Sequence, residues 1–259
     1  LKTPSKLFYI LRKHIKEYSS NRRGMPKLKD LLKPNPSVEG MLVLDKAKFN
    51  KVVTIPYINV SPSKLNDILP HLKKYLIKLP KLKPIQVTND QTRVHLNPEI
   101  ISTWDDITPT DKKSLNKFDI TEENFNFCNR TLTYDNYMVD EVLKAILPDH
   151  QEGISSFTKV GHIIHLNLRE HLLPYKNIIA QILYDKVPHC ETVVNKVHII
   201  DNTYRNFQME VLCGKDDLKT KVKQNGCLFE FDFGTVYWNS RLSIPILTWF
   251  RGCGIVWLC

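Results

Sequence analysis

The stretch "GHIIHLNLREHLLPYKNIIAQILYDKVP", residues 161–188, decides the fold because its hydrophobic period changes halfway along. Apolar and polar residues alternate from Ile164 to Arg169, which is typical of a half-buried strand. The second half has Pro174 near its first turn and Pro188 after its end, as helices often do. Because strands are predicted on both sides of this helix, the stretch indicates a mixed α/β domain.

The flanking sequence extends this domain to residues 147–243. Upstream, "SSFTKV" is predicted as a strand that turns at Gly161. Downstream, "ETVVNKV", "YRNFQMEVLCG" and "GCLFEFDFGTVYW" are predicted as strands, since β-branched and aromatic residues are frequent in them. The domain therefore combines one main helix with several strands.

The amino-terminal half predicts a second, smaller α/β domain at residues 36–102. "MLVL", "KVVTIPYINV", "KPIQV" and "RVHL" are predicted as its strands. Residues 61–80 carry apolar residues at helical spacing, with Ser63 as the expected N-cap and Pro70 expected to kink or split the helix. The polar residues 103–146 are interpreted as a linker that ends in a helix. The predicted fold class is therefore α/β (α+β), with two small mixed domains.

Positive charge is concentrated near the amino terminus. Residues 1–83 hold 19 Lys and Arg against 5 Asp and Glu, a balance of +14, whereas the rest of the chain has a balance of −4. A segment this basic indicates a polyanionic partner, with nucleic acid as the first candidate. A solvated lysine face together with a targeting leader is the alternative.

Residues 1–35 form a basic leader whose apolar residues fall on one helical face. A mitochondrial transit peptide has this pattern, and a basic helix that contacts RNA has it too. The expected location is the mitochondrial matrix, with the nucleus and cytoplasm as alternatives. The six cysteines form no CxxC pair, so we expect reduced thiols and no metal site.

Several polar residues are candidates for contacts with RNA. His165, Asn167 and Arg169 share one face of a predicted strand, where they suit phosphate or base contacts, although an ordinary solvent-facing strand would show the same row. Lys73 and Lys74 lie off the apolar stripe of the predicted helix at residues 61–80 and are further candidates.

Arg205 is the first residue on one face of a predicted strand, and the other residues on that face are apolar. It is either paired with Asp201 or held for a ligand such as guanine or phosphate, and the pattern leaves both interpretations open. The sequence has no phosphate-binding P-loop and no G-x-G-x-x-G fingerprint after a strand, so it predicts no cofactor-binding element of these kinds.

Three long segments, "GHIIHLNLREHLLPYK", "VVNKVHIIDNTYRNFQMEVLCG" and "FEFDFGTVYWNSRLS", strongly resemble the tRNA (guanine-37-N1)-methyltransferases of the eukaryotic and archaeal type. The resemblance covers residues 36–243 and includes "PSVEGMLVLDKAKF". It implies methyl transfer from S-adenosylmethionine to N1 of the guanine that lies 3′ to the anticodon. It also implies that tRNA is bound through its anticodon stem-loop and its body. We expect a monomer that does not enter a membrane.

The resemblance also assigns roles to residues. Arg205 is implied to contact O6 of the target guanine, where negative charge develops as N1 loses its proton. Tyr237, Asn239 and Arg241, in "VYWNSRLS", match residues that line the same site, so they are expected to bind the tRNA.

The end of the chain departs from the family pattern. The family reads N-P-R-L-S-T-E where this chain reads "NSRLSIP", so Pro245 stands in place of the glutamate expected as general base. The Rossmann-like S-adenosylmethionine domain is expected to be missing, and residues 244–259 are interpreted as an aberrant apolar tail, too interrupted to span a membrane. We therefore expect a truncated chain that is inactive alone. The alternatives are a non-catalytic tRNA-binding protein and a relative of the wybutosine-pathway aminocarboxypropyl transferase.

Overall fold

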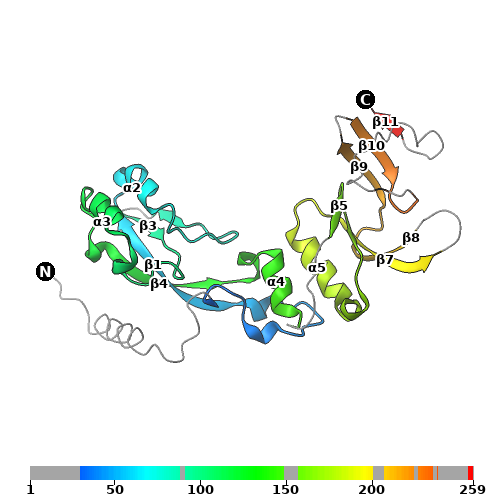
Figure 1. The fold of residues 1–259 in the computed structure, drawn as a ribbon, viewed down its shortest axis with the longest axis horizontal. Helices are drawn as coiled ribbons and strands as arrows, with labels where there is room; N and C mark the ends of the chain where they lie inside the picture. Colours follow the sequence, from blue (N-terminus) through cyan, green and yellow to red (C-terminus); the bar gives the residue numbers. More distant parts are fainter. Residues whose placement is uncertain are drawn as a thin grey trace. The chain divides into compact units, whose positions relative to one another are not determined.

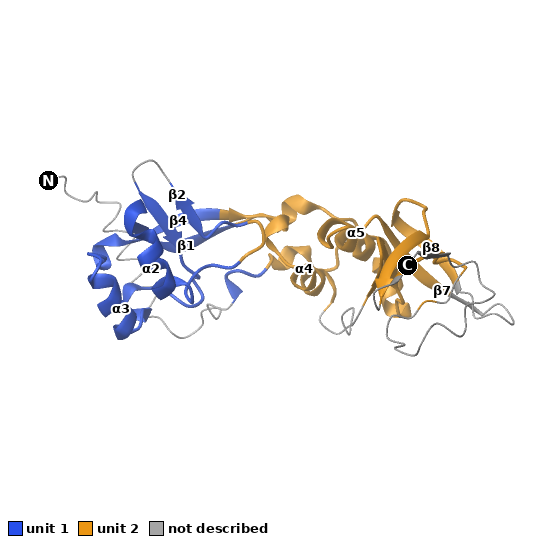
Figure 2. Ribbon diagram, turned by 90° about the horizontal axis from the view of Figure 1, so that it is seen from above, with its two compact units in different colours: residues 1–33, 52–78, 82–130 blue, residues 34–51, 79–81, 131–259 orange. Residues whose placement is uncertain are grey.

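The structure is a computed structural model, and its described residues form two compact units (Figure 2). Unit 1 comprises residues 1–33, 52–78 and 82–130, and unit 2 comprises residues 34–51, 79–81 and 131–259. Nearly all of the predicted leader lies outside the described residues. Those residues are 30–87, 91–148, 157–200, 207–224, 227–235, 238 and 256–258.

Unit 1 is built on a four-stranded sheet in the order β2-β3-β1-β4 (Figure 1). β3 pairs antiparallel with β1 and with β2, so that Tyr57 lies opposite His95 and Arg93 lies opposite Gln86. The sheet confirms the strands predicted in "KVVTIPYINV", "KPIQV" and "RVHL". The strands are β1 (Lys51–Val60), β2 (Ile85–Val87), β3 (Thr92–His95) and β4 (Phe125–Leu132).

Two short helices, α2 (Leu65–Leu72) and α3 (Pro109–Asn116), pack on one face of this sheet. Ile68 and Leu115 from the helices meet Ile58 and Val94 from the strands in one fully buried cluster. Burial of each such side chain contributes about 1.5–3 kcal/mol, so the cluster fixes the helices to the sheet. The 3₁₀ turns of this unit are η4 (Pro62–Lys64), η5 (Trp104–Asp106) and η6 (Glu122–Asn124).

Three predictions in the amino-terminal half were wrong: the length of one helix, its N-cap and one strand. α2 is shorter than the helix predicted for residues 61–80, because the chain turns after Leu72, where the Tyr75 N–H donates to the Leu72 carbonyl. Ser63 lies in η4, before α2, and the residue at the N-cap position is Lys64. "MLVL", residues 41–44, forms no strand.

Residues 103–130, interpreted as part of a linker, belong to unit 1. They supply α3, which packs against α2, and β4, which forms one edge of the sheet. Their weak hydrophobic pattern explains the difference. α3 buries only Asp111 and Leu115, and β4 buries only Leu132, so neither element shows the apolar stripe of a well-covered helix or strand.

Unit 2 contains two helices and two sheets (Figure 1). The first sheet has the order β5-β6-β7-β8, in which β6 and β7 are parallel and the other pairs are antiparallel. The α-helices of unit 2 and the strands of this first sheet are, in chain order, α4 (Val139–Ile146), β5 (Thr158–Val160), β6 (Ile163–Leu166), α5 (Lys176–Lys186), β7 (Thr192–Ile200) and β8 (Phe207–Gly214). The 3₁₀ turns are η2 (Pro36–Val38), η3 (Lys46–Phe49), η7 (Tyr134–Asn136) and η8 (Glu170–Tyr175).

The strand, turn, strand and helix predicted around residues 161–188 are confirmed. Gly161 makes the turn between β5 and β6 with φ of 59°, and a Cβ there would lie 2.1 Å from the Thr220 hydroxyl oxygen. The turn therefore requires glycine. α5 then connects β6 to its parallel neighbour β7, as a parallel pair demands of its crossover connection.

The second sheet, in the order β11-β10-β9, packs against the first. Val160, Ile163 and Val194 of the first sheet share a buried cluster with Phe229 and Phe231 of β10. β9 was not predicted, although its lysines alternate with Thr220 and Val222 as an edge strand allows. The strands are β9 (Lys219–Gln224), β10 (Cys227–Asp232) and β11 (Val256–Leu258).

Three residues of the segment interpreted as an aberrant tail form a strand. The backbone of Val256–Leu258 pairs antiparallel with β10, with residue 256 opposite Glu230. An edge strand has unpaired N–H and C=O groups that can form hydrogen bonds with the backbone of another segment. Because backbone groups make these bonds, a segment without a regular strand pattern can pair here. The rest of residues 244–259 lies outside the described residues.

Candidate nucleic-acid interface

The candidate residues divide into those that the structure describes and those that it does not. Arg205, Tyr237, Asn239 and Arg241 lie outside the described residues. Pro245 lies outside them as well. The described candidates are His165, Asn167 and Arg169 in unit 2, and Lys73 and Lys74 in unit 1.

The row of His165, Asn167 and Arg169 is not a strand face. β6 ends at Leu166, so Asn167 and Arg169 lie beyond the strand, and Arg169 is the N-cap of η8. Both are exposed, whereas His165 is mostly covered. The predicted alternation itself continues, since Leu166 and Leu168 are buried while Asn167 and Arg169 are exposed, but strand pairing ends because the backbone N–H of Leu168 donates to the Asn195 side-chain oxygen.

His165 lies under the second sheet rather than in solvent. Its ring meets Phe233 edge-on, with 5.5 Å between the ring centroids. Burial lowers the pKa of His165, and the nearby charge of Lys196 lowers it further, so the imidazole is neutral at physiological pH. Its buried Nε2 has no hydrogen-bond partner in the part of the chain that the structure describes.

Trp238, which stands between Tyr237 and Asn239 in the sequence, packs against aromatic residues of unit 2. Its indole stacks on Phe231 at 4.7 Å between centroids and also contacts Phe229. Trp238 was not among the predicted site residues, although a large aromatic residue between two candidate binding residues is a signal for such packing. The packing thus fixes the chain at one point inside the predicted substrate-binding segment.

Lys73 and Lys74 line a shallow, open hollow of about 390 Å³ in unit 1. We call this site the lysine hollow; its lining residues are Pro70, His71, Lys73, Lys74, Lys78 and Asp111. Lys73 and Lys78 are exposed. The lysine hollow therefore contains Lys73 and Lys74, which were predicted to lie off the apolar stripe of the helix.

Lys74 is not free to meet a ligand with its full charge. Its ammonium lies 2.7 Å from the Asp111 carboxylate, which also accepts hydrogen bonds from Tyr75 and Thr108. Burial would raise the pKa of Asp111, but the hydrogen bonds from Lys74, Thr108 and Tyr75 outweigh it and hold the pKa at about 2. This ion pair therefore ties the turn after α2 to α3 and neutralises a candidate RNA contact.

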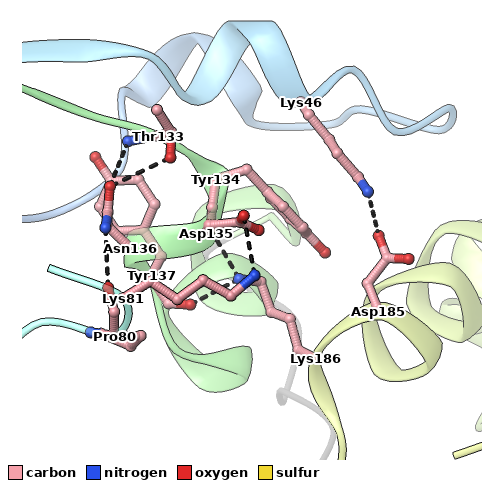
Figure 3. A network of polar contacts seen from close by, with 10 residues as sticks. All are labelled: Lys46, Pro80, Lys81, Thr133, Tyr134, Asp135, Asn136, Tyr137, Asp185 and Lys186. Carbon is pink, nitrogen blue, oxygen red and sulfur yellow. Dashed lines mark hydrogen bonds and ion pairs between the residues drawn. The ribbon is translucent and has the colours of Figure 1, made fainter.

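Lysines of unit 2 also form hydrogen bonds and ion pairs within that unit (Figure 3). The ammonium of Lys186, in the last turn of α5, donates to the carbonyls of Tyr134 and Tyr137 and lies 3.9 Å from the centroid of the Tyr134 ring. Burial lowers the pKa of Lys186. The same side of the unit holds ion pairs from Lys81 to Asp135 and from Lys46 to Asp185.

The described residues contain no group of three or more His, Cys, Asp or Glu that could hold a metal ion. Their helices are all too short or too polar to cross a membrane.

Comparison with known proteins identifies similar sequences. A family model described as the TYW2 N-terminal domain matches residues 139–217. The tRNA (guanine(37)-N(1))-methyltransferase of Drosophila melanogaster is 45% identical over 212 residues, covering 82% of this chain and 46% of that protein. The Aedes aegypti enzyme of the same name is 50% identical over 212 residues, covering 81% of this chain and 37% of that protein.

A solved structure described as "The complex structure of aTrm5 and tRNALeu" is similar to this chain with a TM-score of 0.49 and 17% sequence identity. The similarity covers 73% of this chain and 54% of that chain. The chain spans about half the length, or less, of the curated relatives it matches.

Proposed function

The chain belongs to the family of the tRNA (guanine(37)-N(1))-methyltransferases, and from this premise we propose that it serves the methylation of tRNA at N1 of guanine 37. The observation that carries the proposal is the identity of 45–50% to two insect enzymes over 212 residues. Because a match of that length includes parts of both compact units, both units take part in the proposed function.

In this proposal the described units bind and position tRNA. A formal net charge of +10 favours a polyanion and predicts binding that weakens steeply as salt rises, since bound lysines and arginines release counterions from the phosphates. Exposed Lys73 and Lys78 at the lysine hollow are among the groups that would contribute.

Arg205 is the proposed catalytic residue of this chain. Removal of the proton from guanine N1 moves negative charge onto O6, and a fixed guanidinium beside O6 would stabilise that charge in the transition state. Tyr237, Asn239 and Arg241 are proposed to hold the target base and its loop. These roles are supported by the family pattern of "YRNFQMEVL" and "VYWNSRLS".

S-adenosylmethionine supplies the methyl group in this family, and the described residues do not fit it. The turns at Gly161 and Gly214 pack against the chain itself, since a Cβ at Gly214 would lie 2.1 Å from the Glu191 carbonyl oxygen. The lysine hollow in unit 1 is lined by ammonium groups that repel a sulfonium cation. We assign the cofactor to no residue among those described.

A chimera tests the proposal. Residues 36–243 of this chain would replace the corresponding half of the Drosophila melanogaster relative, and N1 methylation would be read as a primer-extension stop at guanine 37 of a tRNA transcript. The expected result is a stop that depends on S-adenosylmethionine and disappears when guanine 37 is changed to adenine. A folded chimera that binds tRNA but yields no stop, beside an active parent enzyme, would remove the proposal.

A further inference from the structure

The sheet of unit 1 has one face that the described helices α2 and α3 do not cover. Ile58 and Val94 point into the core beneath α2 and α3, so the residues next to them in each strand point the other way. Tyr57 and His95 are opposite each other in the register, as are Gln86 and Arg93, and paired residues share a face. Arg130 of β4 reaches the same face, because its guanidinium contacts His95 and Gln86. We call Tyr57, Gln86, Arg93, His95 and Arg130 the arginine face.

His95 orients Arg130. The Nδ1 atom of His95 lies 3.1 Å from the Pro84 carbonyl oxygen, which can only accept, so Nδ1 carries the proton. Nε2 is then the acceptor for the Arg130 Nη2, 3.2 Å away. Burial lowers the pKa of His95, and the charges of Arg130 and Arg93 lower it further, which keeps this ring neutral.

Arg130 retains most of its donors for a ligand. Within the described residues, its contacts to His95 Nε2 and to the Gln86 side-chain oxygen are both made by Nη2, so Nε and Nη1, which carry three N–H groups, make no hydrogen bond there. Neither partner carries a negative charge, so the guanidinium is held in place without being neutralised. A fixed, unneutralised guanidinium suits the paired oxygens of a phosphate.

The guanidinium of Arg93 lies over the ring of Tyr57 on the same face. The Arg93 Cζ lies 5.2 Å from the centroid of the Tyr57 ring, and the same ring is 5.9 Å from the His95 ring. Both Arg93 and Tyr57 are partly exposed. Bases of RNA stack on guanidinium planes and on aromatic rings of this kind.

The two arginines differ from the lysines in lacking carboxylate partners. Within the described residues, neither Arg93 nor Arg130 makes an ion pair with Asp or Glu, whereas Lys64 and Lys74 of the same unit each do. Charge, planarity and an adjoining aromatic ring therefore coincide on this face.

We propose that the arginine face binds an unpaired nucleotide of RNA, with the base on the Arg93–Tyr57 pair and a phosphate on the free edge of Arg130. The proposal rests on the proposed function in taking tRNA as the RNA. The stacking component makes it specific for nucleic acid over other polyanions, since an acidic peptide or a lipid headgroup has no base to stack.

Affinity measurements on the whole chain test the proposal. Fluorescence anisotropy with a labelled tRNA transcript should show about 10-fold weaker binding for Arg93→Ala and for Arg130→Ala. Arg93→Lys, which keeps the charge and loses the plane, should also weaken binding. The matched control is Lys113→Ala, an exposed lysine on α3, which should bind within about twofold of the unchanged chain.

The outcomes separate the two proposals. If the unchanged chain fails to bind tRNA, the proposed function fails. If it binds and the arginine variants bind equally well, the arginine face is excluded while the proposed function stands. Photocrosslinking of a 4-thiouridine-substituted tRNA to the unchanged chain provides a test without substitutions. A crosslink to the peptide that contains Tyr57 or Arg93 supports the site, and crosslinks confined to other peptides contradict it. Equal competition by vesicles of anionic lipid or by a phosphopeptide would also overturn it.

Discussion

The lysine hollow and the arginine face belong to the same compact unit and both carry positive charge, but they use it differently. In the lysine hollow, Lys74 is bound to Asp111, and that pair joins the turn after α2 to α3. On the arginine face, Arg130 is held by a neutral imidazole and a neutral amide. The first arrangement uses charge to stabilise the fold, and the second leaves it available to a ligand.

This difference shows that counting basic residues overstates the surface available to RNA. Among the described residues of the basic amino-terminal segment, several lysines form ion pairs with aspartates, namely Lys33, Lys46, Lys64, Lys74 and Lys81. Exposed ion pairs contribute little to stability, typically about 0–1 kcal/mol, but each still lowers the local positive potential. The distribution of carboxylates therefore decides where a polyanion is attracted.

The largest expected effect tests the comparison directly. Charge reversal on the arginine face, by Arg93→Glu with Arg130→Glu, should weaken tRNA binding about 100-fold, since two contacts of about 1–2 kcal/mol are lost. The same change in the lysine hollow, by Lys73→Glu with Lys78→Glu, should weaken it only a few-fold. Equal losses in the two variants, measured by anisotropy, would show that the two surfaces contribute alike.

The next effect concerns the fold. Asp111→Asn should lower the free energy of unfolding by about 2 kcal/mol, because the charged hydrogen bonds from Lys74, Tyr75 and Thr108 are weakened together. Urea unfolding followed by circular dichroism measures it. The control is Asp105→Asn, since Asp105 is almost fully exposed and pairs only with Lys112 in the described contacts, so its loss should cost under about 0.5 kcal/mol. Similar losses of unfolding free energy in both variants would show that Asp111 does not join α3 to the turn after α2.

The smallest expected effect is a pH dependence on the arginine face. The pKa of His95 is below its ordinary value of 6.5 in the folded chain, so below that pH the unfolded chain takes up a proton that the folded chain does not. The free energy of unfolding should therefore fall as the pH is lowered from about 7 to 5. His95→Gln, which can still donate to Pro84 and accept from Arg130, should flatten this decline. His165 contributes in the same direction and remains in the variant, so an unchanged slope would show that His95 is not the source.

Much of the fold could be predicted from the sequence, because strong periodicity survives in well-covered elements. β1, β6, α4 and α5 each bury a regular row of side chains, and their predictions were confirmed. α3 and the edge strand β4 bury too few residues to show a period, and the end of α2 depends on a turn that brings Tyr75 to Asp111. The residues that are proposed to carry out the chemistry at the predicted site lie outside the described residues.

The sequence by itself determined the main elements, the concentration of basic residues and the resemblance to a tRNA-modifying family, because these follow from local order along the chain. Only the tertiary structure decided which charges are neutralised. Lys74 meets Asp111 across 37 positions, and Arg130 meets His95 across 35, so neither contact is visible in a local pattern. Folding neutralises the charge of Lys74 with a carboxylate, whereas it holds the charge of Arg130 between two neutral groups. Which of the two occurs depends on which side chains the sheet and its helices bring within hydrogen-bond distance.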